Sequence, residues 1–427
     1  MKLLFYSIIF IEVFTIIYNL IKFLIFKIYN YSFQKTYDSK YNNDFHLYVL
    51  IPCYKEKKVI KNTIQYFLKL INNNSNIDFY IITTQKEKEE NPSLQTTYDY
   101  ILNLNIKSKK FHILNYPHVN GMMADQLNYA INKILESQDL PKDRVYFSIY
   151  NADSHPDSST FIELFKKISQ YHFPKVIQQY SNYFLNYEAQ DFIMRGFSIY
   201  QTAFEFRNGV INNNLSKLLY SHVVGHGLTI RADYITSIGG FTSKFWCEDI
   251  YLTGLIHNSN EKILSLKSFD NAENPTNLKV QIVQNAVWFK TASHHFSIFK
   301  DIQRHNNLSL NGLIWLLHEL RASFIWIFMP LFILYTFVYP IISQNYKLLL
   351  LAIITYFVFI FVNYFLNLLV VNFKRFHNYI KNYFSTCLAV LLTCIGPIYS
   401  LFLKEKIKTE RWINCPKIIS PYFRTIY

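Results

Sequence analysis

Residues 45–56 read FHLYVLIPCYKE, and this stretch decides the fold that the sequence predicts. Its first part, residues 45–51, is dominated by aromatic, β-branched and other apolar side chains, a composition typical of a buried strand. Three more such runs follow, at residues 79–84, 111–116 and 145–150. Helical patterns lie between them, at residues 57–71 and 121–135. Because strands alternate with helices, we predict an α/β fold built on an open, mostly parallel sheet.

Polar residues directly follow two of these strands. Ligands of open parallel sheets bind beyond the carboxyl ends of the strands. Pro52-Cys53-Tyr54-Lys55-Glu56 and Asn151-Ala152-Asp153 both stand at such ends, so they are candidates for a ligand site. An aspartate after a strand also commonly caps a helix, and capping a helix that begins near Asp157 is the alternative role for Asp153.

The apolar content of the chain exceeds what one soluble core needs. The 427 residues are 51% apolar and 18% aromatic. The surplus is gathered in segments of about 20 residues, the length that crosses a bilayer. These segments are residues 3–26, 322–342, 348–371 and 383–403. We therefore predict, in chain order, an N-terminal transmembrane helix (1–30), an α/β domain (44–300), an amphipathic interfacial segment (301–321), a C-terminal membrane region of two or three spans (322–403) and a basic tail (404–427).

The first apolar segment is too long for a signal-peptide core and lacks a small-residue cleavage site, so we expect it to be retained. It carries a polar stripe at helical spacing, made of Glu12, Thr15, Asn19 and Lys22. Such a stripe faces other helices or a water-filled path, or else the helix lies in the membrane interface.

The formal net charge of +14 indicates an anionic partner. No zinc spacing, recognition-helix pattern or aromatic RNA-binding signature accompanies it, so no nucleic acid is expected as partner. Basic residues instead flank the apolar segments, as at a cytoplasmic membrane face that meets anionic lipids. The five cysteines are scattered without paired spacing, which fits a reducing compartment. We predict a multi-pass protein of the cell (inner) membrane with a cytoplasmic α/β domain.

Glu248 and Asp249 interrupt the apolar run FWCEDIYL at residues 245–252. Buried carboxylates need a partner or a shifted pKa, so the pair indicates a cation, a bound hydroxyl or a polar network nearby. The alternative is the first turn of a helix over residues 250–256, where acidic side chains are favoured. About twenty residues earlier stands the turn GHGLTIR, residues 225–231. Clustered glycine indicates close backbone approach or positive φ, as a ligand-binding turn requires.

With these pieces in order, the chain resembles the membrane-bound glycosyltransferase family 2 enzymes, the group that includes cellulose and hyaluronan synthases. The resemblance runs from about Leu47 to Trp288. Five stretches of this chain resemble motifs of the family. They are Ile51–Glu56 (nucleotide side), Gly121–Asn128 (the lysine-bearing loop), Asn151–Asp153 (the metal-binding D-x-D), Gly225–Arg231 with Gly239-Gly240-Phe241 and Glu248-Asp249 (acceptor side), and Gln284–Trp288 (the Q-x-x-R-W motif).

The resemblance implies a GT-A fold and the transfer of a sugar from a nucleotide-diphosphate donor with inversion at the anomeric centre. It places on the donor side Pro52, Tyr54, Glu56, Asn151, Asp153 and Gln284. It makes Asp153 the ligand of a Mg²⁺ or Mn²⁺ ion that neutralises the leaving diphosphate. It makes Asp249 the general base, with Glu248 orienting it or the acceptor. On the acceptor side it places Gly225, His226, Gly227 and Trp288. Plain packing is the alternative for His226 and Trp288, and a strand with only a weak case for ligand contact is expected at Gln178-Gln179.

Three departures from the family pattern bear on function. Asn151 replaces the first D-x-D carboxylate, Met122 or Met123 replaces the loop lysine, and Val287 replaces the arginine that meets the diphosphate. Because a processive synthase usually keeps that arginine, we expect addition of one or a few sugars to a lipid-linked or polysaccharide acceptor. The alternatives are a processive polysaccharide synthase coupled to export and a degenerate, non-catalytic sugar-nucleotide-binding scaffold.

Overall fold

The structure is a computed structural model that describes residues 1–34, 44–72, 74–90, 92–215, 219–245, 247–305, 309–369 and 378–402. Its strands are β1 (His46–Pro52), β2 (Ile77–Thr84), β3 (Phe111–Tyr116), β4 (Val145–Ile149), β5 (His155–Pro156), β6 (Val176–Gln178), β7 (Ser181–Asn182), β8 (Leu228–Arg231), β9 (Ile263–Ser265) and β10 (Asp270–Asn271). The strands predicted from composition are confirmed as β1 to β4.

The helices between these strands include the two that the sequence predicts, now as α2 and α5. They are α2 (Ile60–Ile71), α3 (Lys86–Glu90), α4 (Thr97–Asn103), α5 (Met123–Ser137), α6 (Thr160–Gln170), α7 (Phe192–Phe204), α8 (Asn212–Asn214), α9 (Ala232–Ser237), α10 (Glu248–Asn258), α11 (Leu278–Phe289) and α12 (His295–His305). The apolar helices at the two ends are α1 (Lys2–Gln34), α13 (Leu310–Ile342), α14 (Tyr346–Ile360), α15 (Leu366–Leu368), α16 (Tyr379–Leu392) and α17 (Ile395–Phe402).

The main sheet has the strand order β3-β2-β1-β4-β8-β6-β9 and is mostly parallel, as predicted. β1 pairs in parallel with both β2 and β4, whereas β8 runs antiparallel to β4 and β6. A small second sheet joins β5, β10 and β7. The chain therefore has a mixed α/β architecture.

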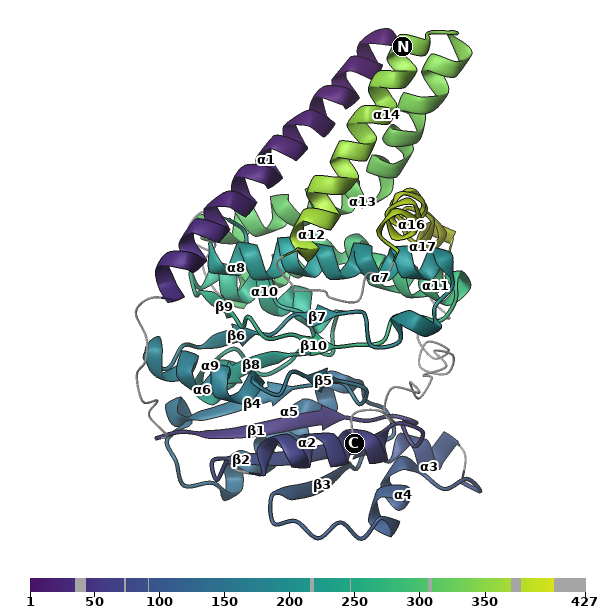
Figure 1. Cartoon of the computed structure of the whole chain (residues 1–427). Helices are drawn as coiled ribbons and strands as arrows, with labels where there is room; N and C mark the ends of the chain where they lie inside the picture. Colours follow the sequence, from purple (N-terminus) through teal and green to yellow (C-terminus); the bar gives the residue numbers. More distant parts are fainter. Residues whose placement is uncertain are drawn as a thin grey trace.

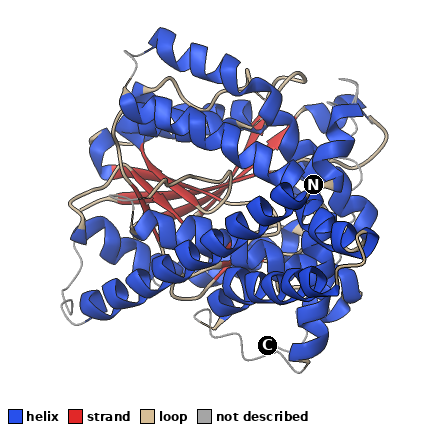
Figure 2. Ribbon diagram, turned by 90° about the horizontal axis from the view of Figure 1, so that it is seen from above, coloured by secondary structure: helices blue, strands red, loops and turns tan. Residues whose placement is uncertain are grey.

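Both faces of the sheet are covered, and β1 shows why its sequence is apolar throughout. Leu47, Val49 and Ile51 belong to the core under α2 and α6, whereas Tyr48 and Leu50 belong to the opposite core under α5 and α9. A strand buried on both sides has no solvent-facing positions, so alternation with polar residues is lost. Figure 2 shows the strands enclosed by helices on either side.

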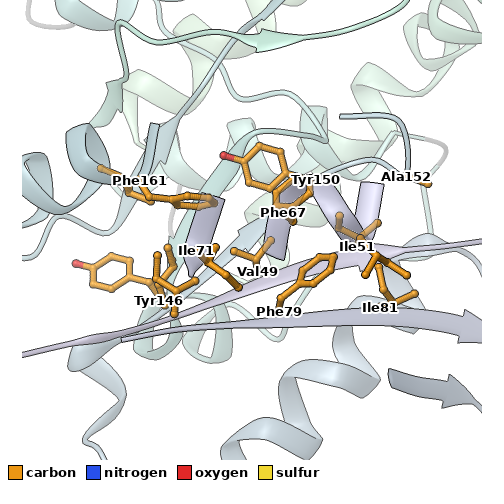
Figure 3. Close-up of a cluster of buried hydrophobic side chains, with 14 of the residues drawn as sticks. Val49, Ile51, Phe67, Ile71, Phe79, Ile81, Tyr146, Tyr150, Ala152 and Phe161 are labelled. Atoms are coloured by element: carbon orange, nitrogen blue, oxygen red, sulfur yellow. The ribbon is translucent and has the colours of Figure 1, made fainter. Parts of the chain in front are cut away.

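The core under α2 is dense in aromatic rings (Figure 3). Phe67 of α2 stacks on Phe79 of β2, with ring centroids 5.3 Å apart and planes within 9°. The buried residues of α2 recur at Ile60, Ile64, Phe67 and Ile71, the spacing of one helical face. This packing fixes the carboxyl ends of β1 and β4 at one edge of the sheet.

Among the residues that the structure describes, four helical segments are long and apolar enough to cross a membrane: residues 2–28, 310–342, 346–368 and 379–402. In Figure 1, α1, α13 and α14 run together away from the sheet, and α16 and α17 lie beside α7 and α11, nearer the sheet. The segment 301–321, expected at the interface, is divided between α12 and the first turns of α13. The predicted basic tail, residues 404–427, falls outside the described residues.

Candidate active site

Glu248 and Asp249 form the first turn of α10, so the helical alternative for this pair is confirmed. This position does not leave them at the surface, because both side chains are half-buried. Burial raises the pKa of Asp249 to about 6. A hydrogen bond from the backbone N–H of Ile250, at 2.9 Å, and the nearby N–H of Gly225 favour the charged carboxylate and oppose that shift. Asp249 therefore changes its protonation close to neutral pH.

The glycine turn before β8 is shaped by a buried glutamine. Gln178 accepts a hydrogen bond from the N–H of Val224 at 3.0 Å and donates one to the carbonyl oxygen of His226 at 2.7 Å. Gly227 has a φ of +64°, and a Cβ there would overlap the backbone oxygen of Gln179. Only glycine satisfies both conditions. The strand predicted around Gln178 is confirmed, and the structure gives its side chain a positioning role.

Asp153 lies in the turn between β4 and β5, well before α6, whose N-cap is Ser159. The capping alternative for Asp153 is therefore wrong. The turn is instead held by Asp270 of β10, which accepts hydrogen bonds from Ser154 Oγ and from the N–H of His155, both at 2.7 Å. Asp270 thus fixes the backbone that carries Asp153.

Asp270 is a site residue that sequence reasoning missed. Its side chain is 1% exposed, and burial, together with the nearby carboxylates of Asp153 and Asp157, raises its pKa to about 7. It belongs to no recognisable motif. Only the pairing of β10 with β5 and β7, which joins distant parts of the chain, brings it to this turn.

One loop connects the two acidic regions. The N–H of Gly225 lies near enough to the carboxylate of Asp249 to favour its charged form. The ring of the next residue, His226, lies with Nδ1 3.8 Å from Oδ2 of Asp270 and within electrostatic reach of Asp153. Burial lowers the pKa of His226, which favours its neutral form. Consecutive residues of one loop therefore face Asp249 and the surroundings of Asp153.

The acidic groups near Asp153 fit a divalent cation if a substrate supplies further ligands. Mg²⁺ is usually held by one or two carboxylates together with phosphate oxygens and water. Asp153 offers a half-buried carboxylate, and Asp270 lies within electrostatic reach of both Asp153 and Asp157. Within the described ranges, no group of three or more His, Cys, Asp or Glu side chains is arranged to hold a metal. A metal ion here would need oxygens from a bound diphosphate.

Pro52 and Asn151, predicted on the donor side, lie at adjacent strand ends. Pro52 is the last residue of β1, and Asn151 follows β4, which pairs with β1 in parallel. The N–H of Asn151 donates to Ser154 Oγ at 3.0 Å. The structure therefore brings both residues to the sheet edge that also carries Asp153.

Tyr54 and Glu56 are tied to the helices beyond β2. The hydroxyl of Tyr54 donates to Glu90, which also pairs with Lys55 at 2.6 Å between Nζ and Oε2. The N–H of Glu56 donates to Thr97 Oγ1 at 3.1 Å. These contacts order the loop after β1 on the side of α3 and α4.

The helix α11 carries the residues that match the Q-x-x-R-W motif. Val287 is 3% exposed, so an arginine at that position would have to enter a packed core. Gln284 and Trp288 are half-buried. Just beyond the helix, Thr291 Oγ1 donates to Sγ of Cys247 at 2.8 Å, immediately before the acidic pair. The end of α11 therefore reaches the site, with valine rather than a cation at the motif position.

A further carboxylate, outside every sequence motif, lies near Asp249. Glu205 begins the π-helical segment Glu205–Ile211 that continues α7. Burial and the charge of Asp249 raise the pKa of Glu205 to about 8, so this side chain is mostly protonated at neutral pH. Because a π-helical turn is not visible in the sequence pattern, no signal could have placed Glu205 here.

The fold has known relatives. The structure is similar to the mannosyltransferase PcManGT from Pyrobaculum calidifontis, with a TM-score of 0.50 and 11% identity over 94% of this chain and 100% of that chain. It is less similar to S. aureus TarS, with a TM-score of 0.42 and 10% identity over 84% of this chain and 93% of that chain. No protein-family model and no curated protein matches the sequence. The likeness to PcManGT shows that this chain shares the fold of that mannosyltransferase.

Proposed function

We propose that this chain is an inverting glycosyltransferase that moves a sugar from a nucleotide-diphosphate sugar to a lipid-linked or polysaccharide acceptor at a membrane. The observation that carries the proposal is the loop at Gly225-His226. Its first residue contacts Asp249, and its second faces Asp270 and Asp153. A single displacement at the anomeric carbon requires a base for the acceptor hydroxyl and a carboxylate on the side of the leaving diphosphate. The loop at Gly225-His226 has one such group on each side.

Asp249 acts as the general base in this proposal. The acceptor hydroxyl loses its proton as its oxygen attacks the anomeric carbon, while the nucleoside diphosphate leaves from the opposite face. A carboxylate with a pKa of about 6 is ionised at neutral pH and still basic enough to take that proton. Glu248 orients the acceptor beside Gly225, where a Cβ would lie 3.1 Å from Oε1 of Glu248.

Asp153 holds Mg²⁺ or Mn²⁺ together with oxygens of the donor diphosphate, and Asp270 keeps its turn in place. When bound, the ion would offset the negative charge of the leaving group. The structure of PcManGT contains GDP-Man and Mn²⁺, which supports a divalent ion in this fold. Pro52, Asn151 and Gln284 line the donor side, and His226, Gly227 and Trp288 the acceptor side.

The membrane part follows from the apolar helices. We infer that α1, α13 and α14 span the cell (inner) membrane and that the sheet domain lies in the cytoplasm. The three helices run side by side away from the sheet (Figure 1), and cytoplasmic nucleotide sugars would then reach Asp153 directly.

The test is a donor panel. Full-length protein purified in detergent is given UDP-, GDP- and dTDP-sugars with Mn²⁺ and membrane lipid extract, and release of the nucleoside diphosphate is measured. We expect turnover of one donor, loss of that turnover in Asp249→Asn, and a raised Mn²⁺ requirement in Asp153→Asn. Glu136→Gln, at an exposed acid paired with Lys133, is the matched control. Absence of turnover with every donor, or full activity in Asp249→Asn, would sink the proposal.

Val287 and Asn151 favour one other function, a non-catalytic sugar-nucleotide-binding scaffold. The packed valine takes the place of a cation, and the amide of Asn151 brings no charge to the diphosphate. Calorimetry separates the two functions. Donor binding without any release of nucleoside diphosphate would indicate the scaffold.

A further inference from the structure

Lys22 of α1 has two further basic side chains within electrostatic reach, Arg207 of the π-helical segment Glu205–Ile211 and Arg321 of α13. Lys22 of α1 is only 5% exposed. Its Nζ donates to the carbonyl oxygen of Arg207 at 3.1 Å and to Oδ1 of Asn212 at 3.0 Å, and both acceptors are neutral. The charged groups that act on Lys22 are Arg207 and Arg321, which are themselves cations. We call Lys22, Arg207 and Arg321 the basic cluster.

No carboxylate balances the basic cluster in the described part of the chain. Its three basic side chains are absent from the ion pairs found there. Glu205 stands only two residues before Arg207, but the charged group that shifts its pKa is Asp249. Buried charges are normally paired or bound to ions. An unbalanced positive cluster of this kind is therefore suited to an anionic ligand.

The arginine of the basic cluster is held in a defined orientation. Nη1 of Arg207 donates to the backbone oxygen of Asn363 at 3.1 Å and to its Oδ1 at 2.8 Å. That Oδ1 also accepts from Nδ2 of Asn19 at 2.7 Å. Asn363 lies in a second π-helical segment, Phe361–Phe365. π-Helical turns are frequent at functional sites, and here two of them meet at one guanidinium.

The surroundings of the basic cluster favour a lipid over a soluble anion. Arg321 is exposed on α13, close to Phe324 and Ile325, which are also exposed. On α1 the exposed Ile21 and Leu24 flank the buried lysine. Lys22 contacts the π-helical segment that continues α7, and α7 lies between the sheet and the far ends of α13 and α14 (Figure 1). An anion bound here would have apolar helix faces beside it on which acyl chains can lie.

We propose that Lys22, Arg207 and Arg321 bind the phosphate or diphosphate headgroup of a membrane lipid. The role of that lipid as acceptor or acceptor carrier rests on the proposed function. The same π-helical segment carries Arg207 toward the basic cluster and Glu205 toward Asp249, so a lipid headgroup bound at Arg207 would end near the proposed base.

The experiment measures lipid binding by the full-length protein in nanodiscs of phosphatidylcholine. The probe is fluorescent phosphatidic acid, and the competitors are unlabelled phosphatidic acid, phosphatidylglycerol and inorganic phosphate. We expect phosphatidic acid to compete best. Lys22→Gln and Arg207→Gln should each weaken probe binding about tenfold or more, because each removes a charge-assisted hydrogen bond. Lys27→Gln, at an exposed lysine of the same helix, is the matched control and should leave binding unchanged.

Arg321→Gln guards against misfolded variants, because the arginine is exposed and its loss disturbs no core. Weaker probe binding in this variant, with an unchanged melting temperature, supports the site. Equal probe binding in the wild type and all three cluster variants overturns it, and so does displacement of the probe by inorganic phosphate as well as by phosphatidic acid. Lipid binding needs no sugar donor. Selective binding without transfer would contradict only the proposed function, and transfer without cluster-dependent binding would contradict only this inference.

Discussion

Asp249 combines an ionised carboxylate at neutral pH with a position beside the glycine turn at residues 225–227. Its pKa of about 6 means that it binds a proton as the pH falls through 6 and releases it above. If Asp249 takes the acceptor proton, the transfer rate should rise with pH to a plateau above about 7. Initial rates from pH 5 to 8 with the best donor check this. Asp249→Asn should lose about 10²- to 10⁴-fold in rate at every pH, the usual contribution of a general base.

The control for the pH profile is Glu136→Gln, which should keep both the plateau and the acidic limb. If the residual activity of Asp249→Asn still falls at acidic pH as in the wild type, another group causes that fall. Asp249 would then not be the general base.

Gly227 and Gly239 allow the cost of a Cβ to be compared at two positions with left-handed backbone. Both have positive φ, +64° and +85°. Alanine at either position is strained by about 1 kcal/mol. At Gly227 the new Cβ would also overlap the backbone of Gln179, whereas at Gly239 nothing lies within 4 Å. Gly227→Ala should therefore destabilise the protein by about 1–3 kcal/mol more than Gly239→Ala, as expected for overpacking. Chemical denaturation followed by tryptophan fluorescence measures both. Equal losses would show that the turn relaxes freely.

At the scale of the element, the π-helical segment Glu205–Ile211 turns two charged side chains in different directions. Its first residue, Glu205, is buried with a pKa of about 8, well above the ordinary value of 4.5. Because the folded-state pKa is raised, the stabilising protonated form is complete below about pH 4.5 and is lost as the pH rises through 8. Glutamine cannot ionise. Glu205→Gln should therefore be more stable than the wild type above pH 8, and nearly equal to it below pH 5.

Melting temperatures of the wild type and Glu205→Gln between pH 5 and 9 test this dependence. Glu188→Gln, at an exposed acid, serves as the control and should follow the wild type. A constant difference across the pH range would mean that ionisation of Glu205 does not contribute.

The elements of this chain differ in how far the sequence could predict them. β1 is readable because it is buried on both faces, so its composition alone marks a strand. The acidic pair is readable because carboxylates are rare in apolar sequence. Asp270 is not, because its role comes from a two-residue strand paired with distant segments. The same holds for Glu205, whose orientation depends on a π-helical turn, and for Gln178, which shapes a loop far along the chain.

At the scale of the whole molecule, the helices α1, α13 and α14 extend toward the end opposite the sheet (Figure 1). The helices α1, α13 and α14 extend away from the sheet, and the turn between α13 and α14 marks the far end. If the sheet domain is cytoplasmic and the bundle spans the membrane, the two ends must be accessible from opposite sides. This arrangement also places the basic cluster near the headgroups on the sheet side, where anionic lipid phosphates are available.

Single cysteines test this orientation. Lys107, in the loop before β3, and Ser343, in the turn after α13, are both exposed. A membrane-impermeant maleimide should label Lys107→Cys in inside-out vesicles and Ser343→Cys in right-side-out vesicles, with the wild type giving the background from its own thiols. The reverse pattern would place the sheet domain outside the cell, away from cytoplasmic nucleotide sugars. Labelling of both positions from one side would mean that α13 does not span the membrane, and the basic cluster would then face water on a peripheral protein.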